Sequence, residues 1–510
     1  MTQQIPNWLK KRAFLSPSRT AIYFENQSYT FQEVYAKTQK IAERLCSLSI
    51  KRGDYIGVLL KNHPDTVIYL YALQMIGASA VILNIRLTED ELAWQLLDSK
   101  CKVLITEDAL LPKIINVKAN QASCSIITKE QLAQTVKTAK TSNKAKTAPA
   151  TSTAILEEFD LDDICTIMYT SGTTGFPKGV KQSYGNHWWS AIGSVLNLGL
   201  ADGDCWLCTV PLFHISGYSI LIKSLVYGIP VVLHDGFQEQ KVIDDIEKYN
   251  VTIMSVVSTI LTRLVRELGN RTISSYFRCM LLGGGPASLA LLEECKLKGI
   301  PVFQTYGMTE TSSQIVTLSP EDCLNKLGSA GKPLFPAQLK IVDNDGQELK
   351  AKQEGEIVVK GPNVTSGYLF REQETAERIR NGWLHTGDIG YVDEEGFLYV
   401  LDRRADLIIS GGENIYPAEI EGVLLAHSQI SDAGVIGVDD EKWGQVPIAF
   451  VVTDGGNLIT EADISHYCQQ KLAKYKIPKK IFFTNQLPRN AANKLLRRDL
   501  RDLLERESGQ

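Results

Sequence analysis

The chain has 510 residues, of which 44% are hydrophobic and 22% charged, and its formal net charge is −4 at pH 7. These values are typical of globular proteins and predict about three domain-sized units with large cores. A chain without a basic excess is a poor partner for nucleic acid or an anionic membrane, and it shows neither a bilayer-spanning apolar run nor a secretory signal.

The ten cysteines are scattered without the spacing of a disulfide framework, which predicts reduced thiols and a cytoplasmic location. Cys205 and Cys208 form a C-x-x-C pair inside an apolar run, residues 205–212, that reads as a strand. A redox or metal site would need a second pair, or a helix that begins after the first cysteine. We therefore interpret both cysteines as structural thiols.

The first third of the chain, from residue 30 to residue 130, alternates helical patterns with short apolar runs. This alternation predicts a parallel α/β sheet. A stretch at 135–155 is rich in Lys, Thr and Ala, lacks aromatic residues, and predicts a solvated connection rather than a nucleic-acid patch. The expected helices are 31–48 and 66–76, and the expected strands are 55–60 and 80–83.

The α/β pattern resumes from 200 to 310 and then changes to short β segments separated by Asp-Gly or Glu-Gly turns. The fold class is therefore α/β: a large N-terminal domain, 1–402, of doubly wound α/β subdomains plus a β-rich subdomain from about 325 to 402, and a smaller α+β domain, 403–510. The expected strands are 230–233, 253–257, 280–282, 301–304, 338–342, 356–360 and 397–401.

One segment narrows the function more than any other. Residues 168–180 read Met-Tyr-Thr-Ser-Gly-Thr-Thr-Gly-Phe-Pro-Lys-Gly-Val, after an apolar run that predicts a buried strand. Hydroxyls, unhindered N–H groups and one cation are what a loop needs to hold a polyphosphate. It is not a Walker A loop, since Gly179 follows the lysine; the alternative is a plain surface turn. The candidate phosphate-binding residues are Thr170, Ser171, Gly172, Thr173, Thr174, Gly175 and Lys178.

Two further segments favour an organic ligand only weakly. His214 lies in an apolar run beside Ser and Gly, where a histidine of the core is the ordinary alternative. A predicted strand ends in Gly283, Gly284 and Gly285, which would let a flat ligand lie against the backbone, although a turn explains them equally well.

Polar residues that suit a nucleotide occur later in the chain. Tyr306, Thr309 and Glu310 follow a predicted strand and suit an adenine ring and Mg²⁺, or else form a turn capped by the threonine. Asp388 and Arg403 stand 15 positions apart and suit a ribose diol, although each alone reads as surface charge. Residues 409–417 form a tight polar loop, and Lys494 lies near the C-terminus.

Taken together and in order, these segments resemble the adenylate-forming superfamily of acyl-CoA synthetases, carrier-loading adenylation domains and beetle luciferases. The resemblance runs from about residue 5 to the end. Asn493 stands before the C-terminal lysine, where the wider superfamily usually has glycine. The matching segments are Tyr169–Gly179, Tyr306–Glu310, Thr386–Asp388, Asp402–Arg403 and Lys494.

A narrower resemblance is to the 2-succinylbenzoate–CoA ligases of menaquinone synthesis, in which asparagine before that lysine is typical. The segments that carry it are 184–190, 211–217, 303–320 and 488–497.

The resemblance implies a two-step reaction. A carboxylate attacks the α-phosphate of ATP to give an acyl adenylate and pyrophosphate, and the thiol of CoA, the co-substrate, then displaces AMP. Lys494, Thr309, Glu310 and Lys178 would be catalytic, with the glutamate holding Mg²⁺. Residues 170–178 would cradle the phosphates, Tyr306 would stack on adenine, and Asp388 and Arg403 would bind the ribose.

The second step implies a mobile C-terminal domain that turns about a hinge at Asp402. The turn replaces the lysine loop by the loop 410–417, whose Gly411, Gly412 and Glu413 line the thiol channel. His214 and glycines 283–285 would bind the acyl group, an aromatic dicarboxylic keto acid. Lys223, on a predicted helix beyond His214, is a candidate partner for the second carboxylate; the alternative is a surface lysine.

Three rival functions stay open at this point. The chain could be another aryl- or fatty-acyl-CoA synthetase, or a freestanding carrier-loading adenylation enzyme. A nucleotide-sensing relic without activity is disfavoured, because relics usually lose a catalytic group and every implied group is present. The sequence also leaves open whether the chain forms a homo-oligomer.

Overall fold

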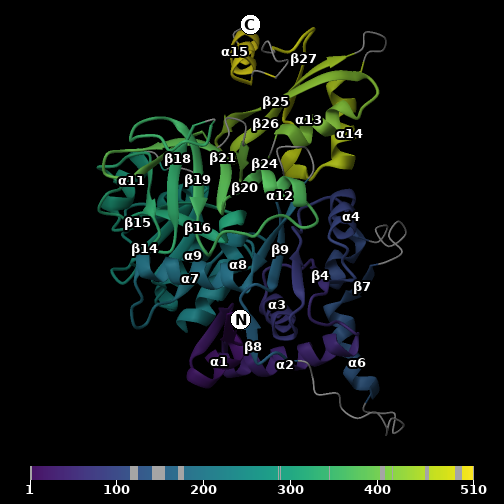
Figure 1. The fold of residues 1–510 in the computed structure, drawn as a ribbon, viewed down its shortest axis with the longest axis vertical. Coiled ribbons are helices and arrows are strands. Elements are labelled where there is room, and N and C mark those ends of the chain that lie inside the picture. Colours follow the sequence, from purple (N-terminus) through teal and green to yellow (C-terminus); the bar gives the residue numbers. More distant parts are fainter. Residues whose placement is uncertain are drawn as a thin grey trace. The chain divides into compact units, whose positions relative to one another are not determined.

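The structure is a computed structural model, shown as a ribbon in Figure 1. Its contacts divide the chain into two compact units, the first made of 1–85, 96–169 and 179–400 and the second of 86–95, 170–178 and 401–510. The described residues are 3–114, 124–139, 155–170, 177–284, 287, 289–343, 345–402, 408–415, 417–453, 459–488, 495 and 497–508.

The first sheet of the first unit has six strands in the order β10-β9-β5-β4-β6-β7. The pairs among β4, β5, β6, β7 and β9 are parallel, which confirms the expected α/β organisation. The strands are β4 (Tyr55–Val58), β5 (Ser79–Ile82), β6 (Val103–Thr106), β7 (Ser125–Thr128), β9 (Ile164–Thr170) and β10 (Lys178–Ser183).

The helices that accompany this sheet begin and end at recognisable signals. The Thr30 side chain accepts from the Glu33 N–H, and the Glu33 carboxylate accepts in return from the Thr30 N–H, so α2 begins with a capping box. Pro64 begins α3 and Gly77, with φ of +71°, ends it. The helices are α2 (Phe31–Ser47), α3 (Pro64–Ile76), α4 (Glu89–Asp98) and α6 (Lys129–Ala139).

The solvated connection predicted at 135–155 is wrong at its start, because α6 continues to Ala139. The sequence of α6, Lys-Glu-Gln-Leu-Ala-Gln-Thr-Val-Lys-Thr-Ala, contains several residues of high helix propensity, and its Lys and Ala residues suit a helix as well as a linker. Residues 140–154 lie outside the described part of the chain.

The second sheet has fourteen strands and joins the second α/β subdomain to the β-rich subdomain, which were expected as separate parts. Its order is β18-β19-β21-β22-β17-β16-β15-β14-β13-β11-β12-β2-β3, with β20 paired to β21. Strands β2 and β11 to β15 pair in parallel, and the pairs recorded for β16 to β22 are antiparallel.

The strands of this sheet are β2 (Thr20–Phe24), β3 (Gln27–Thr30), β11 (Trp206–Cys208), β12 (Val231–Leu233), β13 (Ile253–Val257), β14 (Cys279–Gly283), β15 (Val302–Met308), β16 (Ser313–Leu318), β17 (Ser329–Pro333), β18 (Gln338–Val342), β19 (Gly355–Lys360), β20 (Ile379–Arg380), β21 (Trp383–Val392) and β22 (Leu398–Asp402). The helices are α1 (Trp8–Leu15), α7 (Tyr184–Leu198), α8 (Ile215–Tyr227), α9 (Glu239–Lys248), α10 (Ser258–Leu268), α11 (Leu289–Leu297) and α12 (Glu372–Arg378). A further pair, β1 (Gln4–Pro6) with β8 (Glu158–Asp160), is antiparallel.

One apolar core serves both sheets. It contains Ile56 of β4, Leu70 of α3, Trp206 of β11 and Tyr218 of α8, all at most 1% exposed. Every side chain of α3 except that of Asp65 is buried, which explains why this helix is apolar on all its faces. The shared core holds the two α/β subdomains together as one body, and the strand ends that it fixes carry the candidate site.

The C-terminal part of the second unit is a five-stranded sheet in the order β24-β23-β26-β25, with β27 paired to β26. Its strands are β23 (Ile408–Ser410), β24 (Glu413–Ile415), β25 (Ile430–Asp440), β26 (Gly444–Thr453) and β27 (Lys480–Phe483), and its helices are α13 (Pro417–Leu425), α14 (Glu461–Lys471) and α15 (Arg497–Ser508). The 3₁₀ segments among the described residues are η1 (Asp108–Lys113), η2 (Thr309–Thr311) and η3 (Lys474–Lys476).

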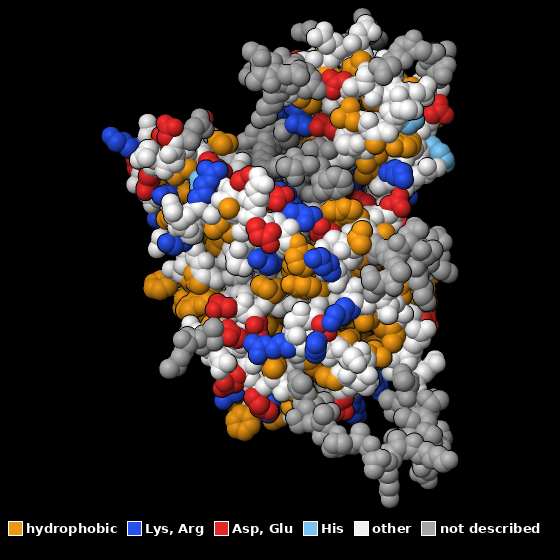
Figure 2. Space-filling view, turned by 45° about the vertical axis from the view of Figure 1, so that its right-hand side comes forward, with side chains coloured by type: hydrophobic (Ala, Val, Ile, Leu, Met, Phe, Trp, Pro, Cys, Tyr) orange, Lys and Arg blue, Asp and Glu red, His pale blue; other side chains and the backbone are white. Residues whose placement is uncertain are grey.

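The surface carries both signs of charge. On the face shown in Figure 2, Lys and Arg side chains are interspersed with Asp and Glu, and hydrophobic side chains occur in several separate groups. Among the described residues, no helix is both long and apolar enough to cross a bilayer.

Candidate functional site

The carboxyl ends of four parallel strands gather several candidate residues at one edge of the second sheet. Strands β11, β13, β14 and β15 run side by side in the same direction. His214 follows β11, Gly283 ends β14, and Tyr306 lies near the end of β15. This edge is where open α/β sheets bind their ligands. The parallel register therefore brings together residues that are far apart in the chain.

Tyr306 and Asp388 are in direct contact. The tyrosine O–H donates a hydrogen bond of 2.7 Å to Oδ2 of Asp388, although the two residues are 82 positions apart. Their exposed fractions are 2% and 8%, so this charge-assisted bond lies in a mostly dry environment. An aromatic ring and a carboxylate, each predicted to touch a different part of one nucleotide, thus share a single location.

A bulge on β21 presents the Asp388 carboxylate. The register between β19 and β21 shifts between Glu356 and Val358, and Gly387 has φ of +74°. Glu356 Oε1 accepts from the Gly387 N–H at 2.8 Å, and Glu356 Oε2 lies 2.8 Å from His385 Nδ1. The sequence alone did not identify Glu356, because its importance depends on which strand β19 pairs with.

Glu310 lies at the tip of a hairpin. Strand β15 leads through η2 to the antiparallel strand β16, and Tyr368 O–H donates to Glu310 Oε1 at 3.1 Å. At Gly307 a Cβ atom would lie 2.2 Å from the Ser313 carbonyl oxygen, so only glycine fits where the register shifts. Tyr368 was missed by sequence reasoning, since it belongs to no recognised segment.

The residues present suit a magnesium ion that arrives with a nucleotide. Within the described ranges, no group of three or more His, Cys, Asp and Glu residues lies close enough to form a metal cage. Mg²⁺ is commonly held by one or two carboxylates together with substrate phosphates, rather than by an all-protein cage. Glu310 is a carboxylate of this kind.

The acyl candidates lie at the same sheet edge. His214 is the residue before α8, and Gly217 packs so closely that a Cβ would lie 2.2 Å from the Pro211 carbonyl oxygen. Gly283 faces the Thr305 hydroxyl, and Gly284 has φ of +88°, a conformation that favours glycine. Gly285 lies outside the described residues.

Lys223 is buried, so its alternative interpretation as a surface lysine is wrong. It is 1% exposed, and its Nζ lies 3.4 Å from Gln314 Oε1 and 4.9 Å from the ring centroid of Trp206. Burial lowers the pKa of Lys223 to about 7. Gln314, which the sequence did not single out, lies on β16, the strand that follows the turn with Glu310.

The buried strand predicted before the phosphate loop is β9, and a second strand, β10, follows the loop. Thr170 ends β9, and Lys178 begins β10 with 9% of its surface exposed. Ser171, Gly172, Thr173, Thr174 and Gly175 lie outside the described residues.

The loop predicted to line the thiol channel is a hairpin between β23 and β24. Gly411 and Gly412 have φ of +56° and +83°, and the Gly411 N–H donates to the Trp443 carbonyl at 2.7 Å. Glu413 is 3% exposed and forms an ion pair with Arg86 within the second unit. Asp402 ends β22, whereas Arg403 and Lys494 lie outside the described residues.

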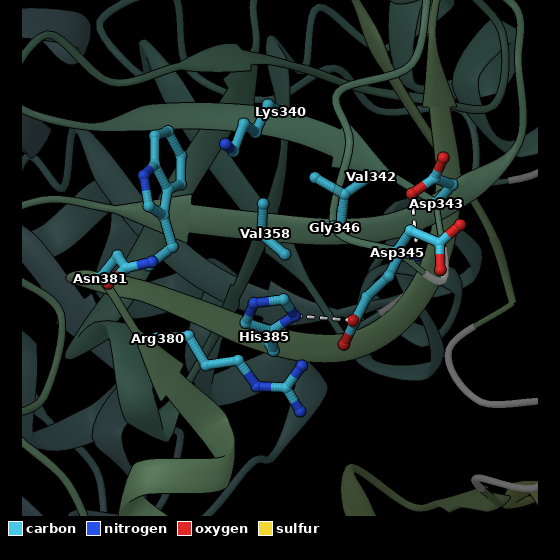
Figure 3. Close-up of a pocket in the computed structure, with 11 residues that line it drawn as sticks. Lys340, Val342, Asp343, Asp345, Gly346, Val358, Arg380, Asn381 and His385 are labelled. Carbon is cyan, nitrogen blue, oxygen red and sulfur yellow. Dashed lines mark hydrogen bonds and ion pairs between the residues drawn. The ribbon is translucent and has the colours of Figure 1, made fainter.

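A separate groove of about 460 Å³ lies on the β-rich subdomain (Figure 3). Trp383 and His385 line this groove, whereas Asp388 bonds to Tyr306 and is not among the lining residues. The groove is therefore not part of the site that contains Asp388. Its lining residues are Lys340, Val342, Asp343, Asp345, Gly346, Glu356, Val358, Arg380, Asn381, Trp383 and His385.

The C-x-x-C pair has the properties of structural thiols. Cys205 and Cys208 are free, 2% and 0% exposed, and burial raises the pKa of each thiol to about 12. Such thiols are neutral and shielded, which makes them unreactive.

Comparison with known proteins gives matches over nearly the whole chain. Residues 9–369 match the AMP-binding enzyme family, and residues 419–494 match the AMP-binding enzyme C-terminal domain. A 2-succinylbenzoate–CoA ligase of Geobacillus sp. (strain WCH70) is 52% identical over 504 residues, which cover 99% of this chain and 98% of that protein.

Solved structures of o-succinylbenzoate CoA synthetase from Bacillus subtilis are also similar. A double mutant bound to its product analogue has a TM-score of 0.90 at 48% identity, over 98% of both chains. A complex with ATP and magnesium ion has a TM-score of 0.74 at 47% identity, over 98% of this chain and 100% of the other. The fold class predicted from the sequence is confirmed by this likeness.

Proposed function

Because the chain belongs to the AMP-binding enzyme family, we propose that it is an ATP-dependent acid–CoA ligase that acts on 2-succinylbenzoate in menaquinone biosynthesis. The products are 2-succinylbenzoyl-CoA, AMP and pyrophosphate, and an acyl adenylate is the intermediate. The observation that carries the proposal is the 52% identity to a ligase of that name over almost all of both chains.

The nucleotide would bind at the contact between Tyr306 and Asp388. The tyrosine ring would stack on adenine while its hydroxyl keeps the Asp388 carboxylate oriented toward the ribose hydroxyls. Arg403 would bind the same ribose. The segment from Thr170 to Lys178 would hold the β- and γ-phosphates through its N–H groups, hydroxyls and ammonium.

The first half-reaction brings two anions together, so its barrier is largely electrostatic. Lys494 would bridge the acyl carboxylate and the nucleotide, and Lys178 would neutralise phosphate charge. Glu310, with Thr309 beside it, would hold Mg²⁺, which would withdraw charge from the phosphate oxygens when bound. The complex of the B. subtilis relative with ATP and magnesium ion supports this cofactor.

The acyl pocket would extend from the sheet edge toward Lys223. His214 and Gly283 to Gly285 would contact the acid near its reacting carboxylate. Lys223 is nine residues along α8 from His214 and is buried. The second carboxylate of the acid would pair with this buried ammonium.

The second half-reaction would use the C-terminal domain, which we place at 403–510 after a first domain of 1–402. Rotation about Asp402, at the end of β22, would bring Gly411, Gly412 and Glu413 to the pantetheine of CoA. The ten free thiols favour a reducing compartment, the cytoplasm, and we leave open whether the enzyme acts as a homo-oligomer.

The direct test is incubation of the purified protein with ATP, CoA, Mg²⁺ and 2-succinylbenzoate, followed by mass detection of the thioester. A panel of acids, with 4-oxo-4-phenylbutanoate, benzoate and a fatty acid, would compare the rates of pyrophosphate release. We expect 2-succinylbenzoate to give the highest kcat/KM. Equal or faster turnover of the acids without a second carboxylate would refute the proposed substrate.

A further inference from the structure

The turn that carries Glu310 is held by three parts of the chain: β10, α7 and the segment 363–365. We call residues 309–312 the Glu310 turn. Each of its four carbonyl oxygens accepts a hydrogen bond from outside the turn. The donors are the Gln182 side chain to Thr309 O (2.9 Å), the Thr365 N–H to Glu310 O (2.7 Å), the Asn363 side chain to Thr311 O (2.9 Å) and the Ser190 hydroxyl to Ser312 O (2.6 Å).

The backbone of the Glu310 turn needs this support. Ser312 and Ser313 have φ of +53° and +114°, and residues other than glycine rarely adopt a positive φ. Such a conformation persists only where the surroundings over-determine it, and strained backbone of this kind is concentrated at functional sites. The hydrogen bonds from outside are what keeps the turn in one conformation.

Gln182 is the donor whose orientation is itself fixed. It lies on β10, four residues after Lys178, and it is completely buried. The Thr166 hydroxyl donates to Gln182 Oε1 at 2.7 Å and lies 2.8 Å from His187 Nε2. Thr166 has only one hydroxyl proton, which it donates to Gln182, so His187 must donate from Nε2 to the Thr166 oxygen. Burial lowers the pKa of His187 to about 3, which keeps the ring neutral.

The chain of donors therefore runs in one direction, from His187 to Thr166, then to Gln182 Oε1. This fixes the Gln182 amide with its NH₂ group toward the Glu310 turn, since the opposite flip would place two acceptors against each other at Thr309 O. A glutamine in a completed buried network is held more rigidly than a lone one.

We propose that Gln182 is a positioning residue for adenylation, which acts by fixing the Glu310 turn so that the Glu310 carboxylate meets the metal–nucleotide complex. The inference rests on the proposed role of Glu310 in holding Mg²⁺. It also links two parts of the site, since the strand that begins at Lys178 directly supports the turn that carries Glu310.

The test is nucleotide binding by calorimetry, with Gln182→Met as the variant and Gln74→Met as its matched control. Gln74 is likewise buried, and its side-chain amide donates to the Tyr218 O–H at 2.6 Å instead of to the Glu310 turn. Because the Tyr218 ring packs on His187, with ring centroids 5.0 Å apart, this control perturbs the same region but leaves the bond to the turn in place. Loss of a residue that supports a metal ligand typically weakens metal binding or activity by about 10- to 100-fold. We expect a loss of this size for ATP with Mg²⁺ in Gln182→Met, and unchanged affinity for AMP without metal.

A general loss of structure would weaken AMP and ATP alike, and this result would overturn the proposal. In the Glu310→Gln background, Gln182→Met should add little further loss, because both changes remove the same interaction. Additive losses would also overturn it. Thr166→Val keeps the shape of the side chain but removes the hydroxyl that orients Gln182, so it should give a smaller loss of affinity for ATP with Mg²⁺. This variant replaces Gln182→Met in the test if Gln182→Met does not fold.

The two hypotheses fail in different ways. If Glu310→Gln binds ATP with Mg²⁺ as tightly as the unchanged protein, the metal role proposed for Glu310 is wrong. If Glu310→Gln loses that binding and Gln182→Met keeps it, the metal role stands and the positioning role of Gln182 is wrong.

Discussion

Replacing Lys223 by methionine should stabilise the protein and impair its choice of substrate. The side chain is 1% exposed, and its pKa falls from the ordinary value of 10.5 to about 7 because the charged form is desolvated. A shift of this size corresponds to a cost of about 4 kcal/mol at pH 7. Loss of the contact with the Trp206 ring returns about 1 kcal/mol of this gain, so we expect a net stabilisation of about 3 kcal/mol.

The sign of the pH dependence follows from linkage. The lysine of the unfolded chain keeps its proton up to its ordinary pKa of 10.5, whereas the folded protein releases it near pH 7. Between these values the unfolded state binds more protons, so the stability of the unchanged protein rises with pH. The advantage of Lys223→Met should therefore shrink by about 1.4 kcal/mol for each pH unit above 7.

The assay is urea unfolding at pH 7, 8 and 9, with Lys296→Met, an exposed lysine of α11, as the control. The same variant should raise KM for 2-succinylbenzoate by about 100-fold, since its second carboxylate would lose its partner, and leave KM for 4-oxo-4-phenylbutanoate unchanged. A destabilised variant, or an advantage independent of pH, would refute the account of a desolvated ammonium. An equal effect on both acids would refute the pairing.

Three other changes test separate parts of the site. Binding of 2-succinylbenzoate to the unchanged protein should weaken as pH rises above about 7, because a Lys223 that has lost its proton must regain it to pair with the carboxylate. Calorimetry in buffers of different ionisation enthalpy should detect this proton uptake. Lys494→Ala should abolish acyl-adenylate formation yet keep the conversion of pre-formed acyl adenylate to thioester; adenylation at the normal rate would contradict its assigned role. Gly307→Ala should unfold the β15–β16 hairpin locally and lower both the affinity for ATP and the thermal stability, because its Cβ would lie 2.2 Å from the Ser313 carbonyl oxygen. A variant with unchanged affinity for ATP would show that the hairpin can relax.

The fold was predictable wherever local patterns agree with tertiary packing. The alternation of 3.6-residue and 2-residue periods identified α2, β4, β13 and β18 at nearly their observed bounds. The apolar run predicts a strand that ends at 304, because Thr305 is polar and Gly307 is a glycine, whereas β15 continues to Met308. These residues continue as a strand because β16 pairs with them, and strand pairing is a tertiary property that no local pattern reports.

Candidate site residues can be proposed from the sequence where a ligand would be held by backbone or by residues close together in the chain. Thr170 to Lys178 and Tyr306 to Glu310 are such segments, and each could be read as a unit. Gln182, Glu356 and Tyr368 could not be proposed from the sequence, because each bonds to a candidate site residue, or to its neighbour in the chain, more than 25 positions away. Their importance appears only when the register of the second sheet is known.

Lys223 shows why burial has to be known before a charged residue can be assigned a role. On a surface, an ammonium costs the protein nothing and specifies nothing, whereas inside a core it must be paired or lose its proton. The protein tolerates the cost of Lys223 in the absence of substrate, and the Gln314 amide and the Trp206 ring lie near its Nζ. A dianionic acid would supply a countercharge, so the same desolvation that destabilises the free protein would make the proposed pocket selective for an acid with a second carboxylate.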